Sequence, residues 1–377
     1  MIFQNDLHKN LLVFVDILRS KNCMEARELY SRLISPSLNI CLADRDGNIA
    51  YQTSGEVPQR LTPPGFESYP LCGWTGEAGW AGMIKGDDLP SEFNPESGRL
   101  VTANHKIVDN EATGYPHYLG NLWQDGYRAE SIFNMIDGKI WRDEKISAND
   151  CAKMQGCCRS SAGLDFVQEA VAVKGLKGTP KKAMAELAKW NGDLAADSVG
   201  ALIYKSCFQF FLNNMLQKMF PKIPLMEFDG QTEDDGHAQG VVAEFLKTVP
   251  DSEERSFFLK ALAGHGFNVV LKAFNECKSI LHGNAFSVLK GRQSIGDRYD
   301  RKKVLRDSVI EAVEWLERKM GADMSQWRWG KLHKLKLLHP LAEKLKMDAL
   351  NMEIEFGGDS TTPNQGEDLI FFISCPR

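Results

Sequence analysis

The sequence lacks three features that would assign it to particular classes of protein. No apolar run approaches the length of about 20 residues that a transmembrane helix needs, which argues against a membrane partner. The formal net charge of −5 and the sequence pI of about 6.0 provide no basic field, which argues against a nucleic-acid partner. Residues 1–6 are not a basic region followed by an apolar core, so we expect no secretory signal and a cytoplasmic chain.

Paired cysteine motifs are missing as well. The chain has nine cysteines, and no Cys-x-x-Cys pair is accompanied by a second pair or by spaced histidines, which argues against the common zinc sites. Only Cys157 and Cys158 are neighbours, and adjacent cysteines rarely bond to each other. Four others stand among apolar residues and are expected to be small buried hydrophobes: Cys23, Cys41, Cys207 and Cys277. We therefore expect reduced thiols in a reducing compartment.

The hydrophobic content of 43% and the length of 377 residues fit a globular protein of two or three domains. In its first part, apolar spacing predicts two short helices within 6–34. An Asp-Gly turn between two β-rich runs predicts a hairpin over 39–51. Frequent glycine and proline predict loops with short strands over 53–98, and we expect Trp74 and Trp80 to anchor this stretch to the core.

The middle of the chain has helical periodicity. Helices are predicted at 129–136, 183–190, 198–217, 238–247, 253–263 and 306–319. Near the end, apolar and polar residues alternate over 327–339 and predict a half-buried strand, with further short strands at 353–356 and 369–374. We expect a β-rich part with two leading helices over 1–128, a helical region over 129–325, and a closing β segment over 326–377.

Several short motifs, in a fixed order, resemble the penicillin acylase family of N-terminal nucleophile hydrolases. They lie at 39–51, 73–76, 94–104, 115–129, 190–198, 329–341 and 357–359. The resemblance implies an α+β fold, a partial four-layer αββα sandwich with a large helical insert. It also implies an amidohydrolase that cleaves a linear or cyclic amide by acyl transfer, a hydrolase acting on carbon–nitrogen bonds other than peptide bonds. The resemblance further implies a function in antibiotic biosynthesis, and members of the family are often periplasmic or secreted.

The nucleophile of that family is the amino-terminal serine of a subunit released by self-cleavage. The family's Ser-Asn dipeptide is absent from this sequence, and removal of Met1 would expose Ile2. Ser37, Ser160 and Ser161 stand in different surroundings. We expect a fragment that is inactive alone and that acts on an amide or N-acyl substrate only with a separate upstream polypeptide. The alternative is a non-catalytic remnant or assembly module of the same fold.

The resemblance assigns roles to three residues. Asn104 matches the oxyanion-hole asparagine, a neutral N–H donor for the carbonyl oxygen that becomes negative. Arg128 matches the arginine that orients this asparagine and the substrate. Leu38 falls where family members line the acyl pocket. The alternatives are a strand-end turn for Asn104, an ordinary ion pair for Arg128 and a core position for Leu38.

No cofactor is expected. Some family members bind calcium, but His117 stands near one of their aspartate ligands, and histidine is a poor ligand for calcium. His105 replaces a second asparagine of some members, and nothing near it indicates a base. Three acids near these positions fit a solvated surface: Asp109, Glu111 and Asp125.

Two histidines and an acidic run could suggest a metal site. His333 and His339 would lie on one face of a strand but about 20 Å apart, too far to share a metal. They are expected to make structural hydrogen bonds. The run at 231–237 lacks the spacing of a calcium loop and is expected to be an acidic surface loop.

Overall fold

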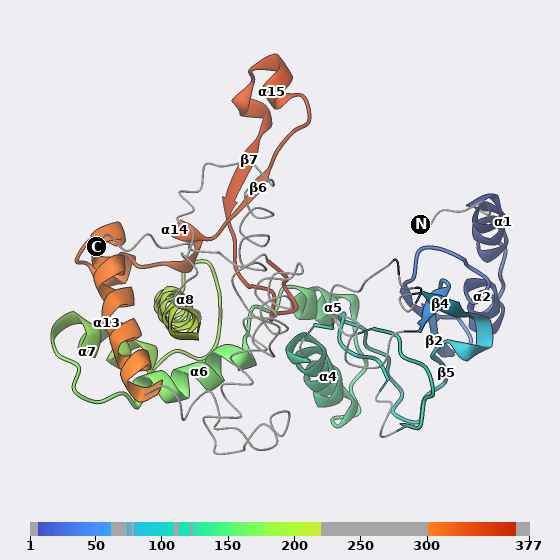
Figure 1. The fold of residues 1–377 in the computed structure, drawn as a ribbon, viewed down its shortest axis with the longest axis horizontal. Coiled ribbons are helices and arrows are strands. Elements are labelled where there is room, and N and C mark those ends of the chain that lie inside the picture. The colour runs from blue at the N-terminus through green and yellow to red at the C-terminus, as the bar shows by residue number, and fades with distance from the viewer. Residues whose placement is uncertain are drawn as a thin grey trace. The chain divides into compact units, whose positions relative to one another are not determined.

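The chain forms two compact units, Met1–Arg142 (unit 1) and Asp143–Arg377 (unit 2), in the computed structural model (Figure 1). The structure describes residues 7–61, 74, 76, 79–108, 113–120, 123–124, 126–219 and 301–366. The predicted helices at 238–247 and 253–263 and the predicted strand at 369–374 lie outside these residues. So do Cys277 and the acidic run 231–237. The predicted three-part division of the chain stays a prediction.

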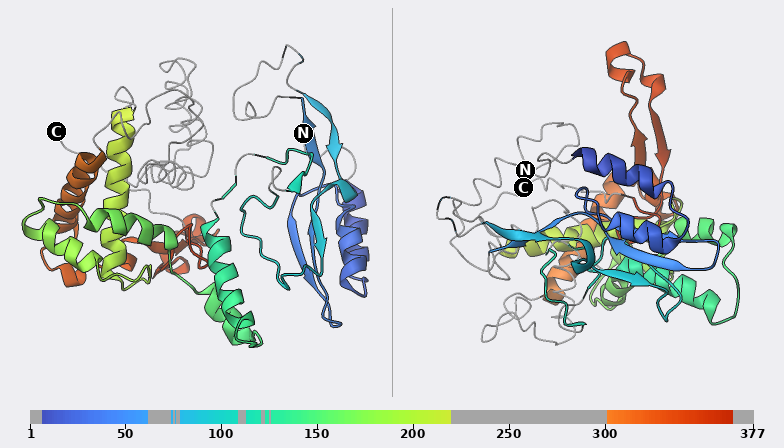
Figure 2. Two further views of the ribbon diagram at one scale, coloured as in Figure 1. Left: turned by 90° about the horizontal axis from the view of Figure 1, so that it is seen from below. Right: turned by 90° about the vertical axis from the view of Figure 1, so that its right-hand side faces the viewer.

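Unit 1 begins with the two predicted helices, α1 (Leu7–Ile17) and α2 (Cys23–Tyr30). Helix α2 begins after Asn22, whose side chain accepts a hydrogen bond from the Glu25 amide and so satisfies a free donor of the first turn. Helix α1 packs on α2, which packs on the neighbouring strands (Figure 2). No described helix is both long enough and apolar enough to span a bilayer.

The predicted hairpin is confirmed as β1 (Asn39–Ala43) and β2 (Ile49–Thr53), and β5 (Ser91–Phe93) completes an antiparallel sheet in the order β1-β2-β5. Asp44 closes the turn by accepting hydrogen bonds from the amides of Asp46 and Asn48. The side-chain amide of Asn48 also donates to Asp44, and this bond, followed by those from the backbone amides, lowers the pKa of Asp44 to about 2. A local hydrogen-bonded turn therefore sets the register of the sheet.

The loop-rich part of unit 1 contains a second small sheet, β3 (Val57–Arg60) with β4 (Trp80–Ile84), and the short 3-10 helix η1 (Gly86–Asp88). The prediction that two tryptophans anchor this part is wrong, because Trp74 is 86% exposed and Trp80 is 50% exposed. A two-stranded sheet leaves much of its surface in solvent. The prediction for Cys41 is also wrong, since this residue is exposed on edge strand β1, whereas Cys23 and Cys207 are buried.

Unit 2 is built around α8 (Val199–Met219), which confirms the helix predicted at 198–217. Every residue from 201 to 208 is buried, as in a helix that is packed on all sides. Three helices pack around it: α6 (Ser161–Val171), α7 (Gly178–Leu187) and α13 (Arg301–Met320). Helices α7 and α13 confirm those predicted at 183–190 and 306–319, whereas α6 and α5 (Ala148–Gln155) were not predicted.

Trp190 packs tightly between α6 and α8, against a glycine of each helix. Its ring stacks on that of Tyr204, with the centroids 5.1 Å apart. A Cβ atom added to Gly163 would lie 2.8 Å from the indole, and one added to Gly200 would lie 2.6 Å from it. Both positions therefore need glycine for the indole to fit.

The strand predicted over 327–339 is largely wrong. The segment follows η3 (Met324–Gln326) and forms the helical turn α14 (Trp329–Leu332) and then a short strand, β6 (Lys334–Leu337). Trp327 and Trp329 are both fully buried. Burial leaves neither indole N–H unsatisfied, because Trp327 donates to the Gly321 carbonyl and Trp329 donates to the Gly358 carbonyl. Two buried tryptophans on a turn produce the same alternation as a half-buried strand.

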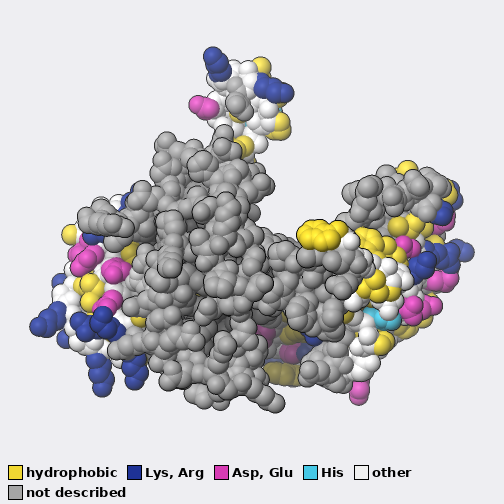
Figure 3. Space-filling view, viewed as in Figure 1, with side chains coloured by type: hydrophobic (Ala, Val, Ile, Leu, Met, Phe, Trp, Pro, Cys, Tyr) yellow, Lys and Arg dark blue, Asp and Glu magenta, His cyan; other side chains and the backbone are white. Residues whose placement is uncertain are grey.

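Strand β6 pairs with β7 (Met352–Glu355), which confirms the strand predicted at 353–356. The pair carries the short helices α15 (Ala342–Leu345) and η4 (Asp348–Leu350) and forms an arm that projects from unit 2 (Figure 1). The pairing puts Lys334 and Lys336 on one face with Glu353, and Leu335 and Leu337 on the other with apolar partners. Apolar and charged side chains are both exposed on the arm (Figure 3).

Candidate functional site

The structure brings Asn104 and Arg128 together in unit 1. Arg128 is the second residue of α4 (Tyr127–Ile140), which confirms the helix predicted at 129–136. The Arg128 side chain is buried, and its Nη2 atom donates to the Ala103 carbonyl at 2.9 Å and to Asn104 Oδ1 at 2.8 Å. One guanidinium nitrogen therefore holds both the backbone and the side chain of the segment that contains Asn104.

This contact determines which way the Asn104 amide faces. A guanidinium group only donates hydrogen bonds, so the atom next to it must be the amide oxygen. The Nδ2 group then remains available as a donor, and none of the hydrogen bonds among the described residues uses it. Asn104 is exposed, so this donor can reach a bound molecule.

The backbone of Asn104 is held in an uncommon conformation. Its φ of +61° lies in the left-handed region, which asparagine tolerates better than most residues. The amide of Gln124 donates to the Asn104 carbonyl at 2.9 Å, and His105 forms an isolated parallel bridge with Gln124. The contacts with Arg128 and Gln124 together fix the backbone and the side chain of Asn104.

The surroundings of Arg128 and His105 favour a cationic arginine beside a neutral imidazole. Burial lowers the pKa of Arg128, but a guanidinium group keeps its charge even so. Burial, and then the charge of Arg128, lower the pKa of His105, so the imidazole is neutral at pH 7. His105 Nδ1 is buried and has no hydrogen-bond partner within the described part of the chain.

Leu38 precedes β1 and is 43% exposed, so the alternative that it is a core leucine is wrong. Its backbone pairs with Ser54: the Leu38 amide donates to Ser54 Oγ at 3.3 Å, and the Ser54 amide donates to the Leu38 carbonyl at 2.9 Å. The exposed side chain can contact a ligand. Its assignment to an acyl pocket stays a prediction.

The two histidines near the carboxyl end make structural hydrogen bonds, as predicted. His333 is buried, stacks on Trp329 with a centroid distance of 4.5 Å, and pairs through Nδ1 with the Phe356 carbonyl at 2.6 Å. His339 accepts a hydrogen bond from the Leu341 amide at 3.2 Å. His117 and Tyr115 form a T-shaped ring pair, with the centroids 5.5 Å apart.

Three or more His, Cys, Asp or Glu side chains do not gather as a metal site would require anywhere among the described residues. Asp109, Glu111 and Asp125 lie outside that part of the chain.

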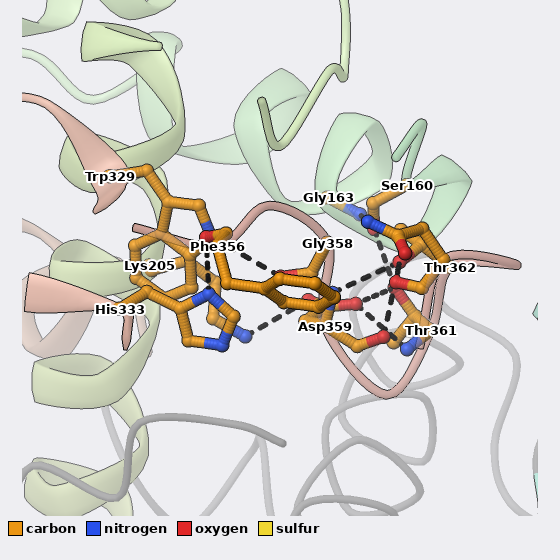
Figure 4. Close-up of polar contacts among 11 residues, drawn as sticks. Ser160, Gly163, Lys205, Trp329, His333, Phe356, Gly358, Asp359, Thr361 and Thr362 are labelled. Atoms are coloured by element: carbon orange, nitrogen blue, oxygen red, sulfur yellow. Dashed lines mark hydrogen bonds and ion pairs between the residues drawn. The ribbon is translucent and has the colours of Figure 1, made fainter. Parts of the chain in front are cut away.

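Unit 2 contains a buried ionic network that the sequence patterns did not reveal (Figure 4). Lys205 Nζ on α8 lies 3.0 Å from Asp359 Oδ2, and the two side chains are 4% and 0% exposed. Asp359 Oδ1 accepts from the amide and the hydroxyl of Thr361, and this hydroxyl also pairs with that of Ser160 at 2.8 Å. The signals in the sequence were a lysine among the mainly apolar residues of the first half of α8 and an aspartate in the glycine motif at 357–359.

The 357–366 loop that carries Asp359 approaches other backbone closely. The Gly358 amide donates to the Leu194 carbonyl at 2.8 Å. Gly358 has a φ of +77°, and a Cβ atom there would collide with the Asn364 carbonyl. The glycine motif at 357–359 therefore lets the loop fold back so that Asp359 reaches Lys205.

The sequence and the fold of the chain are similar to those of known proteins. The sequence model of the penicillin amidase family matches residues 2–370. The acyl-homoserine lactone acylase QuiP of Pseudomonas aeruginosa is 24% identical over 348 residues, which are 88% of this chain and 35% of that protein. QuiP of Pseudomonas syringae pv. syringae is 25% identical over 374 residues, which cover 96% of this chain and 40% of that protein.

A third relative is the penicillin acylase 2 proenzyme of Pseudomonas sp. strain SE83, which is 27% identical over 170 residues, 45% of this chain and 21% of the proenzyme. This chain thus spans well under half the length of these relatives. The structure of a thermostable penicillin G acylase from Alcaligenes faecalis matches with a TM-score of 0.55 and 16% identity. The match covers 86% of this chain and 54% of that one.

The structural match confirms the predicted fold class, α+β of the N-terminal nucleophile hydrolase type. The family match extends over nearly the whole chain and includes the segments that contain Asn104, Arg128 and Asp359. It confirms the resemblance drawn from the sequence motifs. The chain belongs to the penicillin amidase family.

Proposed function

We propose that this chain supplies the oxyanion-stabilising part of an amide hydrolase whose nucleophile comes from outside the chain. The hydrogen bond from Arg128 to Asn104 Oδ1 is the observation that carries the proposal, because it turns the Nδ2 donor away from the arginine. A cation that binds the amide oxygen also draws electron density from the amide nitrogen and makes its N–H groups stronger donors.

The proposed chemistry is acyl transfer. A serine oxygen attacks the amide carbon, and the electron pair of the carbonyl double bond moves onto its oxygen, where Asn104 Nδ2 would donate to the new charge. Collapse of this intermediate breaks the carbon–nitrogen bond and releases the amine, which takes up a proton. Water then attacks the acyl-serine, and the acid is released.

The proposed substrate is an N-acylated small molecule. The names of the relatives, acyl-homoserine lactone acylase and penicillin acylase, support this class. Leu38, with its exposed side chain, would contact an apolar acyl group. An upstream polypeptide would supply the serine. Cytoplasmic localisation and a function in antibiotic biosynthesis remain predictions.

A non-catalytic assembly module is the second candidate. The absence of a Ser-Asn dipeptide from the sequence favours it, because no residue of the chain matches the family's nucleophile motif. In that case the Arg128–Asn104 contact would serve only to hold α4 against the segment that precedes it.

Co-expression distinguishes the two candidates. The chain would be produced alone and together with the reading frames directly upstream of its gene, and release of primary amine from N-acyl-homoserine lactones and penicillin G would be measured. We expect turnover only in the co-expressed sample. There, Asn104→Ala should lower kcat by about 100-fold to 1,000-fold.

Turnover by the purified chain alone, or a co-expressed Asn104→Ala variant that is as active as the parent, would refute the proposal. Amine release that is absent from every sample would favour the assembly module.

A further inference from the structure

A second contact joins the Asn104 segment to α4. Arg99 Nη2 donates to Asp137 Oδ2 at 2.8 Å, and Arg99 Nε lies 2.5 Å from Asp137 Oδ1. The guanidinium carbon also lies 4.6 Å from the centroid of the Phe133 ring. Asp137 and Phe133 are four residues apart on α4 and so share one face of the helix. The hydrogen bond, the close Nε–carboxylate contact and the cation–π contact together give this ion pair a more defined geometry than a single charge contact has.

The pair is more shielded from solvent than a typical surface ion pair. The side chains of Arg99 and Asp137 are 25% and 18% exposed. By contrast, the side chains of the pair formed by Glu28 of α2 and Arg32, just beyond the end of that helix, are 67% and 57% exposed. Partial burial weakens screening by water and salt, so the Arg99–Asp137 contact should restrain the chain more than an exposed pair would.

The two contacts lie at opposite ends of one short segment. Arg99 comes five residues before Asn104, a distance that extended backbone can span over about 17 Å. Asp137 comes nine residues after Arg128, a rise of about 13 Å along the helix. The segment can therefore lie along α4, in the opposite direction to the helix, with an arginine contact at each end.

Regular secondary structure does not position this segment. Residues 99–102 belong to no helix or strand, and left-handed residues flank the stretch, Gly98 with φ +67° and Asn104 with φ +61°. Without a strand ladder, side-chain contacts must set the position of the segment along α4. Arg128 donates hydrogen bonds to its final two residues, Ala103 and Asn104.

We propose that Arg99 and Asp137 are positioning residues for the Asn104 donor. Their ion pair sets how far the segment extends along α4, and so sets the distance and angle at which Asn104 meets Arg128. This inference rests on the proposed function for its catalytic consequence, but its structural claim can be measured in the chain by itself.

The test uses the full chain labelled with ¹⁵N at asparagine side chains. The Asn104 amide signal is identified as the one missing from Asn104→Gly. Asp137→Asn should shift or broaden this signal, and Arg99→Lys, which keeps the charge but loses the planar guanidinium group, should do so to a lesser extent. Arg32→Lys, at the exposed ion pair with Glu28, is the control and should leave the signal unchanged.

An Asn104 signal that keeps its position in folded Asp137→Asn would overturn the inference. If Asp137→Asn fails to fold, an unmoved signal in Arg99→Lys overturns it equally. Arg128→Lys should move the Asn104 signal whether or not Arg99 and Asp137 position it. If Arg128→Lys is the only variant that moves the signal, the proposed function stands and the positioning role of Arg99 and Asp137 is refuted. In the co-expressed enzyme, Asp137→Asn should lower kcat by about 10-fold to 100-fold with little change in KM.

Discussion

The ammonium group of Lys205 lies 3.0 Å from the carboxylate of Asp359, a residue 154 positions later in the sequence. Both side chains are almost completely removed from water. Burying two charges costs several kcal/mol per ion, and the hydrogen bonds from Thr361 to Asp359 offset part of this cost. The pair attaches the 357–366 loop to the central helix of unit 2.

Removal of one member of this pair should destabilise the protein strongly. Lys205→Met leaves the Asp359 charge buried without its counter-ion, and we expect the free energy of unfolding to fall by about 3–5 kcal/mol. The double variant Lys205→Met, Asp359→Leu buries no charge and should lose less than the single variant. Urea unfolding followed by circular dichroism measures the three values.

Lys189→Met is the matched control, because Lys189 pairs with Glu186 at 2.9 Å while its side chain is 73% exposed. This variant should change the free energy of unfolding by less than about 1 kcal/mol. Equal effects of Lys189→Met and Lys205→Met on the free energy of unfolding would show that burial of the Lys205–Asp359 pair has no energetic consequence.

Arg128→Lys should release Asn104 although it keeps the positive charge. Both bonds come from one nitrogen, Nη2, and the shorter side chain of lysine does not bring its ammonium group to that position, so it cannot reproduce the bonds to Ala103 and Asn104. A hydrogen bond to a charged group contributes about 1.5–3 kcal/mol, and a loss of this size should appear as a lower unfolding midpoint. Arg45→Lys, at an exposed turn, should leave the midpoint unchanged. An unchanged midpoint in Arg128→Lys would contradict the structural importance of the contact.

The backbone conformation of Asn104 can be tested with two substitutions. Asn104→Gly and Asn104→Ala both remove the amide group and its bond with Arg128. Only alanine suffers from a φ of +61°, which costs about 1–2 kcal/mol for a residue with a Cβ atom. The alanine variant should therefore be less stable than the glycine variant by that amount in chemical denaturation. Two variants of identical stability would refute the left-handed conformation.

His105 should make the stability of the protein depend on pH. Burial and the charge of Arg128 lower its pKa in the folded state below the usual value of about 6.5. The unfolded chain then binds the proton more tightly, so the stabilising contribution is complete above about pH 6.5 and is lost as the pH falls through the lower folded pKa. His105→Gln should remove this part of the pH dependence.

Unfolding free energies of the parent and of His105→Gln, measured between pH 7.5 and pH 5, decide the point. The difference between the two proteins should change as the pH falls. A difference that stays constant over this range would show that His105 titrates alike in the folded and unfolded chains.

Local patterns predicted the elements whose cause is local. The hairpin of β1 and β2 needs only its turn, which Asp44 closes through bonds to residues two and four positions away. Helices α2 and α13 follow from apolar spacing along a few turns. Family motifs then singled out Asn104 and Arg128, and the structure joins them by a bond across 24 positions.

Predictions failed where burial depends on distant partners. Trp74 and Trp80 are large and apolar, yet the described part of unit 1 leaves both exposed. Trp327 and Trp329 alternate with polar residues as strand residues do, yet both are buried. The carbonyl groups that accept from their indole N–H groups, and the side chains packed around them, are not revealed by the local sequence. No periodicity distinguishes a buried lysine such as Lys205 from an exposed one.

The sequence by itself determined the family, the order of most helices and strands, and the residue types available for amide chemistry, because these depend on neighbours along the chain. Tertiary structure alone decided that Arg128 turns the Asn104 donor outward, that Arg99 meets Asp137, and that Lys205 meets Asp359. Each of these pairs joins residues far apart in sequence, and the energy of a charge contact depends on distance and burial, which only the folded chain defines.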